Sequence, residues 1–478
     1  MRRKKKESKF NKINIINILN LIFVTILLIL LVKLNMIPKN YMMIITAILT
    51  LYEVLCIFLT NLKNKPCKII GIVLSFLSIV GCTFCSYYLY NGDSFLDKAF
   101  DNTKKENYIT YYVVTYSGNT ASNRNDINDT VYYVNNDSNI NNAIDTLKKY
   151  TKSNITQTDN IVNLFNLIGS KQVSFALISN SSYEILFSNN TNLKKENYKV
   201  VYQFRIKIKN NVDSNKTSSK EKFNIYISGT DFANLSDFNM IATVNMNTHK
   251  ILLTSIPRDY YIPVSGTNGI RDNLSFIGVN DVDTRIKSIE NYFGINFDYY
   301  LKINTNSLVG IVDAVGGIEY CSDESFTTTH AVILNSYDDS KGRKLNVKKG
   351  CQHLNGIQTL TVARERNEFA GRDRQRQKNC QAIIVDIFEQ LKSVNTLANY
   401  NNILNSLGDL YETSLSREII ENIMKDTING ANWTFENQSV DGSDGQDLIH
   451  LNSMKGWVMY PMEDTVTNAK AKINEILK

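Results

Sequence analysis

The sequence predicts an α/β protein with three N-terminal transmembrane helices, a small α/β accessory domain and a larger α/β/α layered domain. Three long apolar runs fill most of residues 13–90, and beyond them strand-like and helix-like segments alternate. The chain has 478 residues, which is too long for one ordinary domain. These observations together indicate a membrane anchor followed by at least two folded units.

The three apolar runs are Ile13–Val32, Tyr41–Thr60 and Ile69–Tyr90. Each is long enough to cross the hydrocarbon core of a bilayer, which takes about 20 residues in a helix. A single run of this kind also fits a signal peptide or a buried helix, but three in succession do not. We therefore expect an integral membrane protein.

Basic residues set the expected orientation of the spans. Two lysines, Lys33 and Lys39, lie in the first loop, and three lie in the second, Lys63, Lys65 and Lys68. Seven basic residues precede the first span, namely Arg2, Arg3, Lys4, Lys5, Lys6, Lys9 and Lys12. We expect a multi-pass protein of the cell membrane with its N-terminus in the cytoplasm and everything after the third span outside the cell.

The net charge of +7 arises largely from this cytoplasmic head and the loops. The outer part of the chain is nearly balanced, which argues against nucleic acid as a partner. Of seven cysteines, Cys321, Cys351 and Cys380 fall in the expected outer part, where oxidation is favoured. Cys321 and Cys351 flank the same predicted insertion, so a disulfide and two free thiols both remain open.

The first outer unit, residues 92–215, is predicted to be the accessory domain. Residues 92–107 are polar and indicate a linker leaving the membrane, and Asn210–Lys220 indicates a second linker. Between them, periodicity predicts helices around Ile140–Tyr150 and Asn160–Leu167. Strands are predicted at Tyr108–Tyr116, Val173–Ile178 and Lys199–Lys209.

The second outer unit, residues 216–393, alternates strands and helices and is predicted to be the layered catalytic domain. Its expected strands are Phe223–Ser228, Met240–Asn245, Ile251–Ile256, Tyr299–Ile303 and Ile318–Tyr320. Its expected helices are Val282–Phe293, Asn306–Val315, Asn355–Val362 and Gln377–Leu391. Residues 394–478 are expected to pack on this domain.

An arginine cluster is the strongest chemical signal in the sequence. The chain uses 39 lysines and only 14 arginines, yet five arginines fall within thirteen residues: Arg364, Arg366, Arg372, Arg374 and Arg376. Arginine used against the local preference indicates that its planar, bidentate guanidinium matters. Phosphate or pyrophosphate is the natural ligand. A solvated basic loop is the alternative, although most such loops would use lysine here.

Carboxylates at strand ends supply a second signal. Asp231 follows the first strand of the layered unit, Asp237 precedes the second, and Asp259 follows the third, beside Arg258. Open α/β sheets place their sites in loops at strand ends. Such carboxylates, near an arginine cluster, suit a divalent cation bound between them and a pyrophosphate. Each one alone would more often be a turn residue or a helix cap.

Several familiar catalytic motifs do not occur in the sequence. It contains neither a Walker loop nor a Gly-x-Ser-x-Gly elbow nor His-Glu-x-x-His, and its cysteines and histidines lack zinc spacing. Nucleoside triphosphates are not available outside the cell, so phosphate chemistry there needs a donor that is already activated. A donor held in the bilayer would explain the membrane anchor.

These residues resemble the LytR–CpsA–Psr phosphotransferases of Gram-positive cell envelopes. The three spans, the small outer domain and the C-terminal part with Trp433 are similar to the CpsA-like branch. The matching segments run in the family's order over residues 222–392. They are Ile225–Asp231, Ser236-Asp237, Thr248–Tyr261, Tyr299–Gly317, Leu354–Leu360 and Ala363–Gln381.

The resemblance implies transfer of a phosphate-linked glycopolymer, such as teichoic acid or capsule, from an undecaprenyl-pyrophosphate carrier to peptidoglycan. It implies that Asp231 and Asp237 hold Mg²⁺ (or Mn²⁺). The arginines that match the family's pyrophosphate ligands are Arg258, Arg364, Arg366 and Arg376, and the acids that order them are Asp259 and Asp373. A muramic-acid hydroxyl is the implied acceptor, with Asp231 or Asp259 as a candidate for taking its proton.

The sequence also departs from the family pattern. Leu235 stands where the family usually has arginine, and Asn273 where it often has a basic residue, with Arg271 as a candidate substitute. Arg372 and Gln377 replace usual glycines, and Arg372 or Arg374 is a candidate to restore the missing charge. Two other functions therefore stay open: a hydrolase of lipid-linked pyrophosphate, and a binding or regulatory protein without turnover.

Overall fold

The computed structural model describes residues 12–100, 107–135, 137–188, 193–208, 221–231, 234–267, 269–329, 344–391, 411–451 and 453–478. The basic residues before Lys12 and the whole predicted linker Asn210–Lys220 lie outside these ranges. The chain divides into two compact units. One contains the N-terminal helices together with residues 416–433, and the other contains most of the rest.

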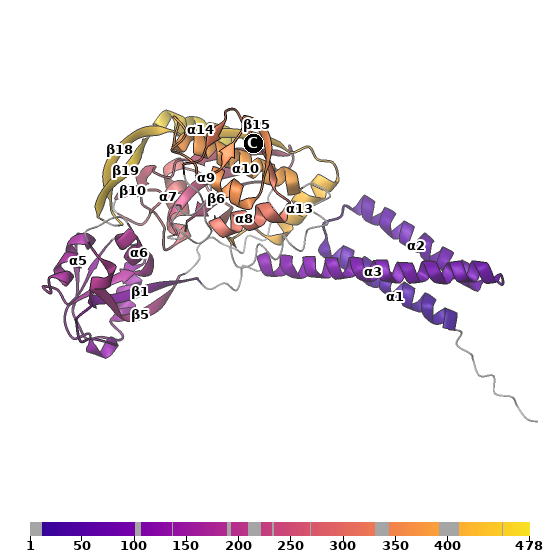
Figure 1. The fold of residues 1–478 in the computed structure, drawn as a ribbon, viewed down its shortest axis with the longest axis horizontal. Helices are drawn as coiled ribbons and strands as arrows, with labels where there is room; N and C mark the ends of the chain where they lie inside the picture. The colour runs from indigo at the N-terminus through magenta and orange to yellow at the C-terminus, as the bar shows by residue number, and fades with distance from the viewer. Residues whose placement is uncertain are drawn as a thin grey trace, which may run out of the picture. The chain divides into compact units, whose positions relative to one another are not determined.

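Three apolar helices form the N-terminal part, as expected. They are α1 (Lys12–Leu34), α2 (Lys39–Asn61) and α3 (Lys65–Phe100) (Figure 1). Each has a segment long and apolar enough to cross a membrane: Ile15–Leu34, Lys39–Asn61 and Lys65–Ser94. Apolar side chains cover much of their outer surface, with Leu51 70% and Phe76 63% exposed. Side chains of this kind suit contact with lipid rather than water.

The helix α3 continues to Phe100, so the prediction of a linker over residues 92–107 was wrong for its first nine residues. Asp93 and Asp97 lie four residues apart and therefore point from the same side of α3. Both accept hydrogen bonds from Arg417 of α13 (Arg417–Ile428), Asp93 at 2.7 Å and Asp97 at 2.5 Å. This ion-pair cluster stabilises the polar end of α3 as a helix. Local composition does not predict the cluster, because Arg417 is distant in the sequence.

The accessory region contains a five-stranded sheet in the order β3-β2-β4-β1-β5. β1 is antiparallel to both of its neighbours, and β2 is parallel to both of its neighbours. The helix α4 (Ile140–Leu147) packs on one face, and α5 (Ile161–Gly169) and α6 (Asn180–Ser188) pack on the other. The strands are β1 (Asn107–Tyr116), β2 (Val131–Val134), β3 (Ile155–Thr158), β4 (Phe175–Ser179) and β5 (Tyr198–Ile208).

The larger sheet has six strands in the order β16-β11-β6-β7-β8-β17. They are β6 (Lys222–Thr230), β7 (Ser236–Asn245), β8 (Lys250–Ile256), β11 (Tyr299–Asn304), β16 (Tyr411–Thr413) and β17 (Thr434–Ser439). The pairs β11–β6 and β17–β8 are parallel, and the other pairs are antiparallel. The last part of the chain thus supplies both edge strands, which the sequence did not predict. The mixed α/β class itself is confirmed.

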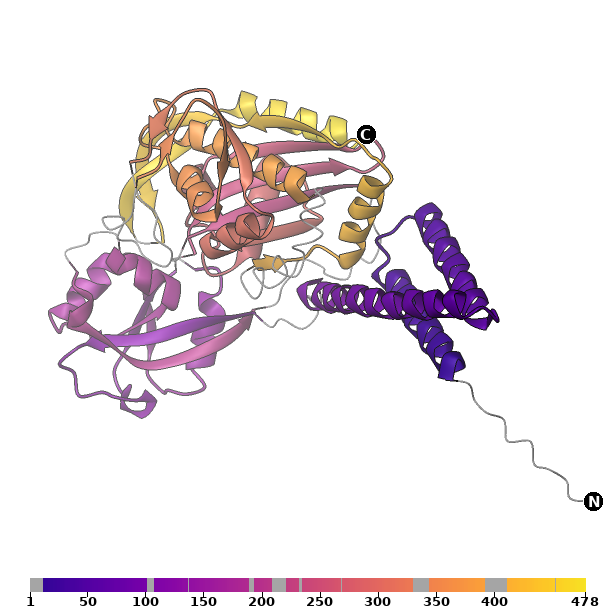
Figure 2. The ribbon, with the colours of Figure 1, turned by 45° about the vertical axis from the view of Figure 1, so that its right-hand side comes forward.

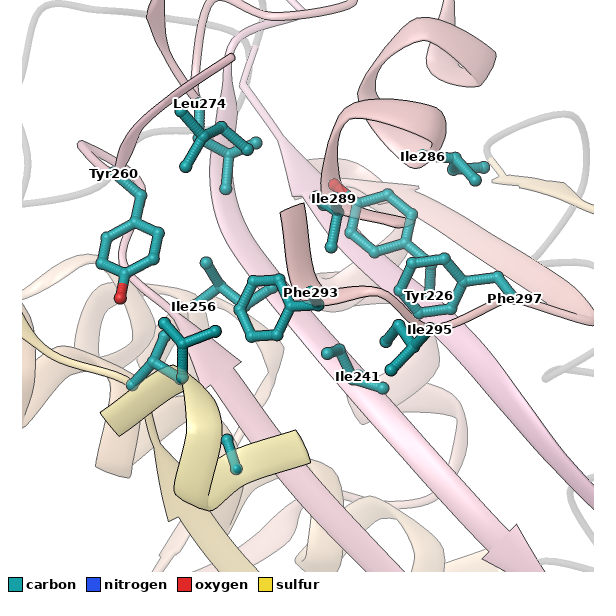
Figure 3. Packing of buried hydrophobic residues seen from close by; sticks show 14 of the residues in the cluster. Tyr226, Ile241, Ile256, Tyr260, Leu274, Ile286, Ile289, Phe293, Ile295 and Phe297 are labelled. Atoms are coloured by element: carbon teal, nitrogen blue, oxygen red, sulfur yellow. The ribbon is translucent and has the colours of Figure 1, made fainter. Parts of the chain in front are cut away.

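One face of this sheet packs against α7 (Val282–Phe293) and α14 (Glu463–Ile476). Figure 3 shows Ile289 and Phe293 of α7 beside Tyr226 and Ile241 of the sheet. These side chains are at most 1% exposed. Because a fully buried aliphatic or aromatic side chain contributes roughly 1.5–3 kcal/mol, this layer is a principal source of the stability of the unit.

The helices α8 (Thr305–Ala314), α9 (Gly356–Arg364) and α10 (Asp373–Leu391) occupy the opposite face (Figure 2). They share an apolar cluster that includes Val312, Val362 and Ile383. The strands β12 (Ile318–Ser322) and β15 (Gly350–Leu354) pair beside it, and a disulfide joins Cys321 to Cys351 across that pair. The structure thus decides between the two states that the sequence left open for these cysteines.

Two small hairpins complete this region. The strands β9 (Tyr261–Pro263) and β10 (Arg271–Asn273) form one, and β18 (Gly442–Ile449) and β19 (Met454–Pro461) form the other. The second, which we call the C-terminal hairpin, contacts the loop that carries Arg258. The amide of Met459 donates a 2.6 Å hydrogen bond to the carbonyl of Asp259.

Candidate functional site

Two acids lie around the turn that joins β6 to β7. Asp231 closes this turn: its amide donates to the carbonyl of Leu235 at 3.0 Å, and its carboxylate accepts from the amide of Leu235 at 2.9 Å. Asn234 adopts φ 61°, a left-handed conformation that asparagine tolerates better than most residues. The turn returns the chain directly into β7, whose second residue is Asp237.

The strand register brings Asp237 and Arg258 together. In the antiparallel pair of β7 and β8, Asn239 lies opposite Ile256, so two residues further along position 237 lies opposite position 258. The guanidinium of Arg258 donates to the carboxylate of Asp237, and its Nε donates to Asp259 at 3.2 Å. Both partners of the first pair are mostly buried, with side chains 18% and 23% exposed.

Three arginines of the predicted cluster surround the same carboxylate. Arg364 ends α9, Arg366 follows it, and Arg376 lies in the first turn of α10. Burial by itself raises the pKa of Asp237, but Arg258, Arg376, Arg364 and Arg366 outweigh it and lower this pKa. Four guanidinium groups from three separate segments therefore act on one carboxylate.

The positive charges are not fully compensated by the acids. Burial, and then the neighbouring charges of Arg258 and Arg376, lower the pKa of Arg366 although Asp259 and Asp237 oppose the shift. The pKa of Arg258 is raised despite burial, because Asp237, Asp259, Asp373 and Asp231 lie near it. A site whose arginines repel one another favours an added anion, and a diphosphate has the charge to satisfy several of them at once.

The other predicted residues are distributed unevenly. Asp373 begins α10 and pairs with Arg376 three residues later. Arg374 points to the C-terminal hairpin, where its Nε donates to Asp441 at 2.7 Å. Arg271 lies exposed on β10 and donates to the carbonyl of Tyr261 at 3.3 Å. The structure thus groups Asp373 with the cluster, gives Arg374 a partner outside it, and places Arg271 on a different strand pair.

Two residues outside the predicted set of ligands hold the site together. Glu365, between two of the arginines, is 2% exposed and accepts hydrogen bonds from the amides of Asn367 and Thr329 at 2.8 and 2.5 Å. Asn273 donates to Asp259 at 3.0 Å and to the carbonyl of Trp457 at 2.8 Å. In the sequence, only the position of this acid between two arginines could have pointed to Glu365.

Leu235, which stands where the family usually has arginine, lies in an apolar environment. It packs against a cluster that contains Ile185 of α6, Tyr261 of β9 and Val458 of β19. A guanidinium at this position would have to be desolvated among aliphatic side chains. The departure therefore suits the contact between the accessory sheet domain and the site loop.

Two cavities meet at the arginine cluster. Arg364, Arg376 and Asp237 line an apolar pocket of about 80 Å³, whose other lining residues include Leu308, Leu360, Ile383 and Ile384. Arg258 and Arg366 line a polar cleft of about 720 Å³. Members of the arginine cluster thus line both an apolar pocket and a much larger hydrophilic cleft.

The carboxylates of the site are compatible with a divalent cation that the protein and the substrate bind together. Asp231 and Asp237 both lie close enough to Arg258 to raise its pKa. Within the described ranges, no group of three or more His, Cys, Asp or Glu residues is placed to hold a metal. Mg²⁺ commonly takes one or two carboxylates together with substrate phosphates and water, so two acids suffice.

Residues 184–472 match the LytR_cpsA_psr family. The match spans well over half of the chain and includes all of the arginines and acids described above. The protein belongs to this family.

The chain is also similar to individual proteins. The chain is 27% identical over 253 residues to the polyisoprenyl-teichoic acid–peptidoglycan teichoic acid transferase TagU of Enterococcus faecalis, covering 49% of this chain and 78% of the relative. It is 28% identical over 230 residues to the protein of the same name from Bacillus mycoides, covering 47% and 71%. The solved structure of TagV from B. subtilis matches with a TM-score of 0.45 and 21% identity, over 54% of this chain and 98% of TagV.

Proposed function

We propose that this protein transfers a phosphate-linked glycopolymer, such as a teichoic acid or another wall polysaccharide, from an undecaprenyl-pyrophosphate carrier to peptidoglycan. The observation that carries the proposal is an arginine cluster whose members line both an apolar pocket and a polar cleft. A carrier-linked glycopolymer likewise combines an apolar lipid, an anionic diphosphate and a hydrophilic saccharide. The names of the TagU relatives, which are teichoic acid transferases, support the same reaction class.

In this reaction a hydroxyl oxygen of peptidoglycan attacks the phosphorus that carries the polymer. The bond from that phosphorus to the bridging oxygen breaks, and the carrier leaves as a lipid monophosphate. Arg258, Arg364 and Arg376 stabilise the negative charge that moves onto the leaving phosphate, because fixed cations in a water-poor site need little reorganisation. A divalent cation held by Asp231 and Asp237 would supply further neutralisation of the phosphate oxygens.

The proton of the attacking hydroxyl needs an acceptor, and two carboxylates are candidates. Asp231 belongs to the turn before β7, and Asp259 is held by Arg258 and Asn273. Replacing each with asparagine keeps its size and removes its basicity. The base is the residue whose replacement lowers the transfer rate without weakening the binding of farnesyl pyrophosphate, measured without a divalent cation because Asp231 is also a proposed cation ligand.

The apolar pocket is the candidate site for the lipid. Its volume of about 80 Å³ is smaller than an engineered cavity of roughly 150 Å³ that accommodates benzene. A prenyl chain therefore enters only if the helices that line the pocket move apart. Leu308 of α8, Leu360 of α9 and Ile383 of α10 are the walls that would have to separate.

We place the reaction at the outer surface of the cell membrane. The three apolar helices supply the anchor, and the excess of basic residues before α1 and between α2 and α3 favours a cytoplasmic N-terminus. An odd number of crossings then leaves the sheet domains outside. Labelling of a cysteine introduced at exposed Lys148 by an impermeant maleimide in intact cells checks this orientation, and labelling only after lysis contradicts it.

The decisive experiment uses the full-length protein in nanodiscs, a radiolabelled lipid-linked polymer and purified wall. Transfer predicts label that stays with the wall after detergent washing. A hydrolase would release soluble polymer instead, and a binding protein would give neither product. Arg364→Ala should abolish wall labelling, whereas Arg205→Ala, at an exposed arginine of β5, should leave it unchanged.

The role of the cation is tested by binding rather than by turnover. Farnesyl pyrophosphate should bind more tightly when Mg²⁺ or Mn²⁺ is added to chelator-treated protein, and Asp237→Asn should remove this gain. Equal affinity with and without the cation would leave the arginines as the only diphosphate ligands.

A further inference from the structure

The polar cleft beside the arginine cluster has one wall that the proposed chemistry does not explain. This wall is formed by residues of β19, among them Lys455, Gly456 and Trp457. Trp457 is 64% exposed, whereas Trp433, the other tryptophan of the chain, is 4% exposed. An exposed tryptophan in a concave polar surface is unusual, because its large apolar ring is normally buried.

The position of this wall relative to the arginines is fixed by several hydrogen bonds. Asn273 is 2% exposed and joins the carboxylate of Asp259 to the carbonyl of Trp457. The amide of Met459 donates to the carbonyl of Asp259 at 2.6 Å. On β18 the start of the hairpin is held by Arg374, which donates to Asp441 and to the carbonyl of Gly442 at 2.7 and 2.9 Å. The hairpin is therefore a fixed wall of the site.

The accessory sheet domain supports the hairpin from its other end. The hydroxyl of Ser453 accepts a 3.3 Å hydrogen bond from the amide of Ile161, where α5 begins. Ile185 of α6 shares an apolar cluster with Ile449, Leu451 and Val458. Both ends of the hairpin are thus anchored, and its middle, with Trp457, faces the cleft.

The charge of the cleft narrows the class of ligand. Five cationic side chains and three carboxylates line it, and Arg258 and Arg374 also pair with Asp237 and Asp441 outside the lining. Burial and the neighbouring cations nevertheless lower the pKa of Arg366, so an anionic ligand is favoured beside it. The cations are Arg258, Arg366, Arg372, Arg374 and Lys455, and the carboxylates are Asp259, Asp373 and Asp444. Arg372 adopts φ 44°, a conformation that costs a non-glycine residue about 1 kcal/mol or more and is often retained at ligand sites.

We propose that this cleft is a subsite for an anionic saccharide, with Trp457 as the aromatic platform on which a sugar ring stacks. A pyranose ring has an apolar face of C–H groups that fits a flat aromatic ring, and hydroxyl and acidic groups at its edge that hydrogen-bond to arginine and lysine. The cleft volume of about 720 Å³ accommodates more than one sugar ring. The inference rests on the proposed function, because the sugar belongs either to the transferred polymer or to the acceptor wall.

Intrinsic fluorescence gives a direct test, because Trp433 is buried and only Trp457 can contact a ligand in the cleft. The full-length protein in nanodiscs is titrated with three probes: farnesyl pyrophosphate, farnesyl pyrophosphate extended by a disaccharide, and soluble muramic-acid oligosaccharides from digested wall. We expect a blue shift with a sugar-bearing probe and none with farnesyl pyrophosphate alone. A response to the lipid-linked disaccharide assigns the cleft to the donor, and a response to the wall oligosaccharides assigns it to the acceptor.

Variants then separate stacking from folding. Trp457→Ala should weaken the binding of the sugar-bearing probe by about tenfold, since tryptophans are frequent hot spots of binding. It should leave the affinity for farnesyl pyrophosphate unchanged. Trp457→Tyr should restore most of the affinity. Leu448→Ala, at a half-exposed residue of the same hairpin that does not line the cleft, is the matched control and should change nothing.

Two outcomes overturn the subsite: no spectral response to either sugar-bearing probe, or an equal loss of affinity for farnesyl pyrophosphate in Trp457→Ala. These outcomes are distinct from failure of the proposed function. If transfer to wall is observed and Trp457→Ala transfers normally at limiting substrate, the subsite alone is wrong. If sugar binds through Trp457 but wall is never labelled, the subsite stands and the transferase proposal fails.

Discussion

The guanidinium of Arg374 donates a 2.7 Å hydrogen bond to the carboxylate of Asp441, which lies directly before β18. A residue that the sequence grouped with the phosphate ligands therefore joins α10 to the C-terminal hairpin. Arg376, two residues further along the same helix, pairs with Asp373 and acts on Asp237. The two arginines point from different sides of one helical turn and make different contacts.

This division predicts different binding defects for two substitutions. Arg364→Ala should weaken the affinity for farnesyl pyrophosphate by roughly tenfold to a hundredfold, because a hydrogen bond to a charged group contributes about 1.5–3 kcal/mol. Arg374→Ala should change that affinity less than about threefold, because its partners lie on the hairpin. Isothermal titration of both variants measures the difference. Equal losses would show that Arg374 binds the diphosphate directly.

Asp272 predicts a pH dependence of stability. It is 6% exposed, and burial raises its pKa to about 7 although backbone amides of Asn273, His450 and Leu451 oppose the shift. Because the folded pKa lies above the unfolded value, the stability linked to this group is present below about pH 4 and is lost as pH rises through 7.

Asp272→Asn should therefore raise the free energy of unfolding at pH 8, by on the order of 1–4 kcal/mol, and change it little at pH 4, where the carboxyl is protonated in the folded protein and largely protonated in the unfolded chain. Thermal unfolding of the detergent-solubilised protein at both pH values is the measurement. Asp447→Asn is the control, since that partly exposed acid has a lowered pKa and should show no stabilisation at pH 8. A pH-independent effect of Asp272→Asn would contradict the assignment.

The ion-pair cluster between α13 and α3 is expected to be important for stability. Asp93 is 2% exposed, so Arg417→Met leaves a buried carboxylate with Lys33 as its remaining cation. Breaking a buried pair on one side typically costs about 3–5 kcal/mol. The double variant Arg417→Met/Asp93→Asn should recover part of that loss, because it removes both charges.

An exposed ion pair in the accessory domain provides the control for these variants. Lys195 and Glu184 are 50% and 49% exposed at 2.7 Å, so Lys195→Met should cost less than about 1 kcal/mol. Thermal unfolding of the two cluster variants and the control in one detergent compares them directly. A cost for Arg417→Met no larger than that of the control would show that the cluster does not contribute to stability.

Leu235→Arg restores the residue that the family usually carries, yet we expect it to harm this protein. Its side chain would enter the apolar cluster of Ile185, Tyr261 and Val458, where a charge lacks a partner. The melting temperature should fall by several degrees, and transfer activity should not rise. Leu235→Met, which conserves volume, should be nearly neutral. A gain in activity would instead show that the missing arginine limits the site.

The sequence by itself determined the features that depend on local pattern. Apolar runs of about twenty residues specify the three membrane helices, and the 3.6-residue period of Val282–Phe293 specifies α7 within its observed bounds. Arginine used against a lysine background pointed to the residues that surround Asp237. These signals are carried by composition and spacing, which need no knowledge of distant contacts.

Tertiary structure decided what depends on distant partners. The edge strand β17 has the sequence TFENQS, whose polar residues do not alternate as a half-buried strand requires, and only its pairing with β8 makes it a strand. The end of α3 is helical and bound to Arg417, which lies 324 residues from Asp93 in the sequence. Likewise, Asn273 hydrogen-bonds both to Asp259 and to the carbonyl of Trp457, and no local pattern contains that information.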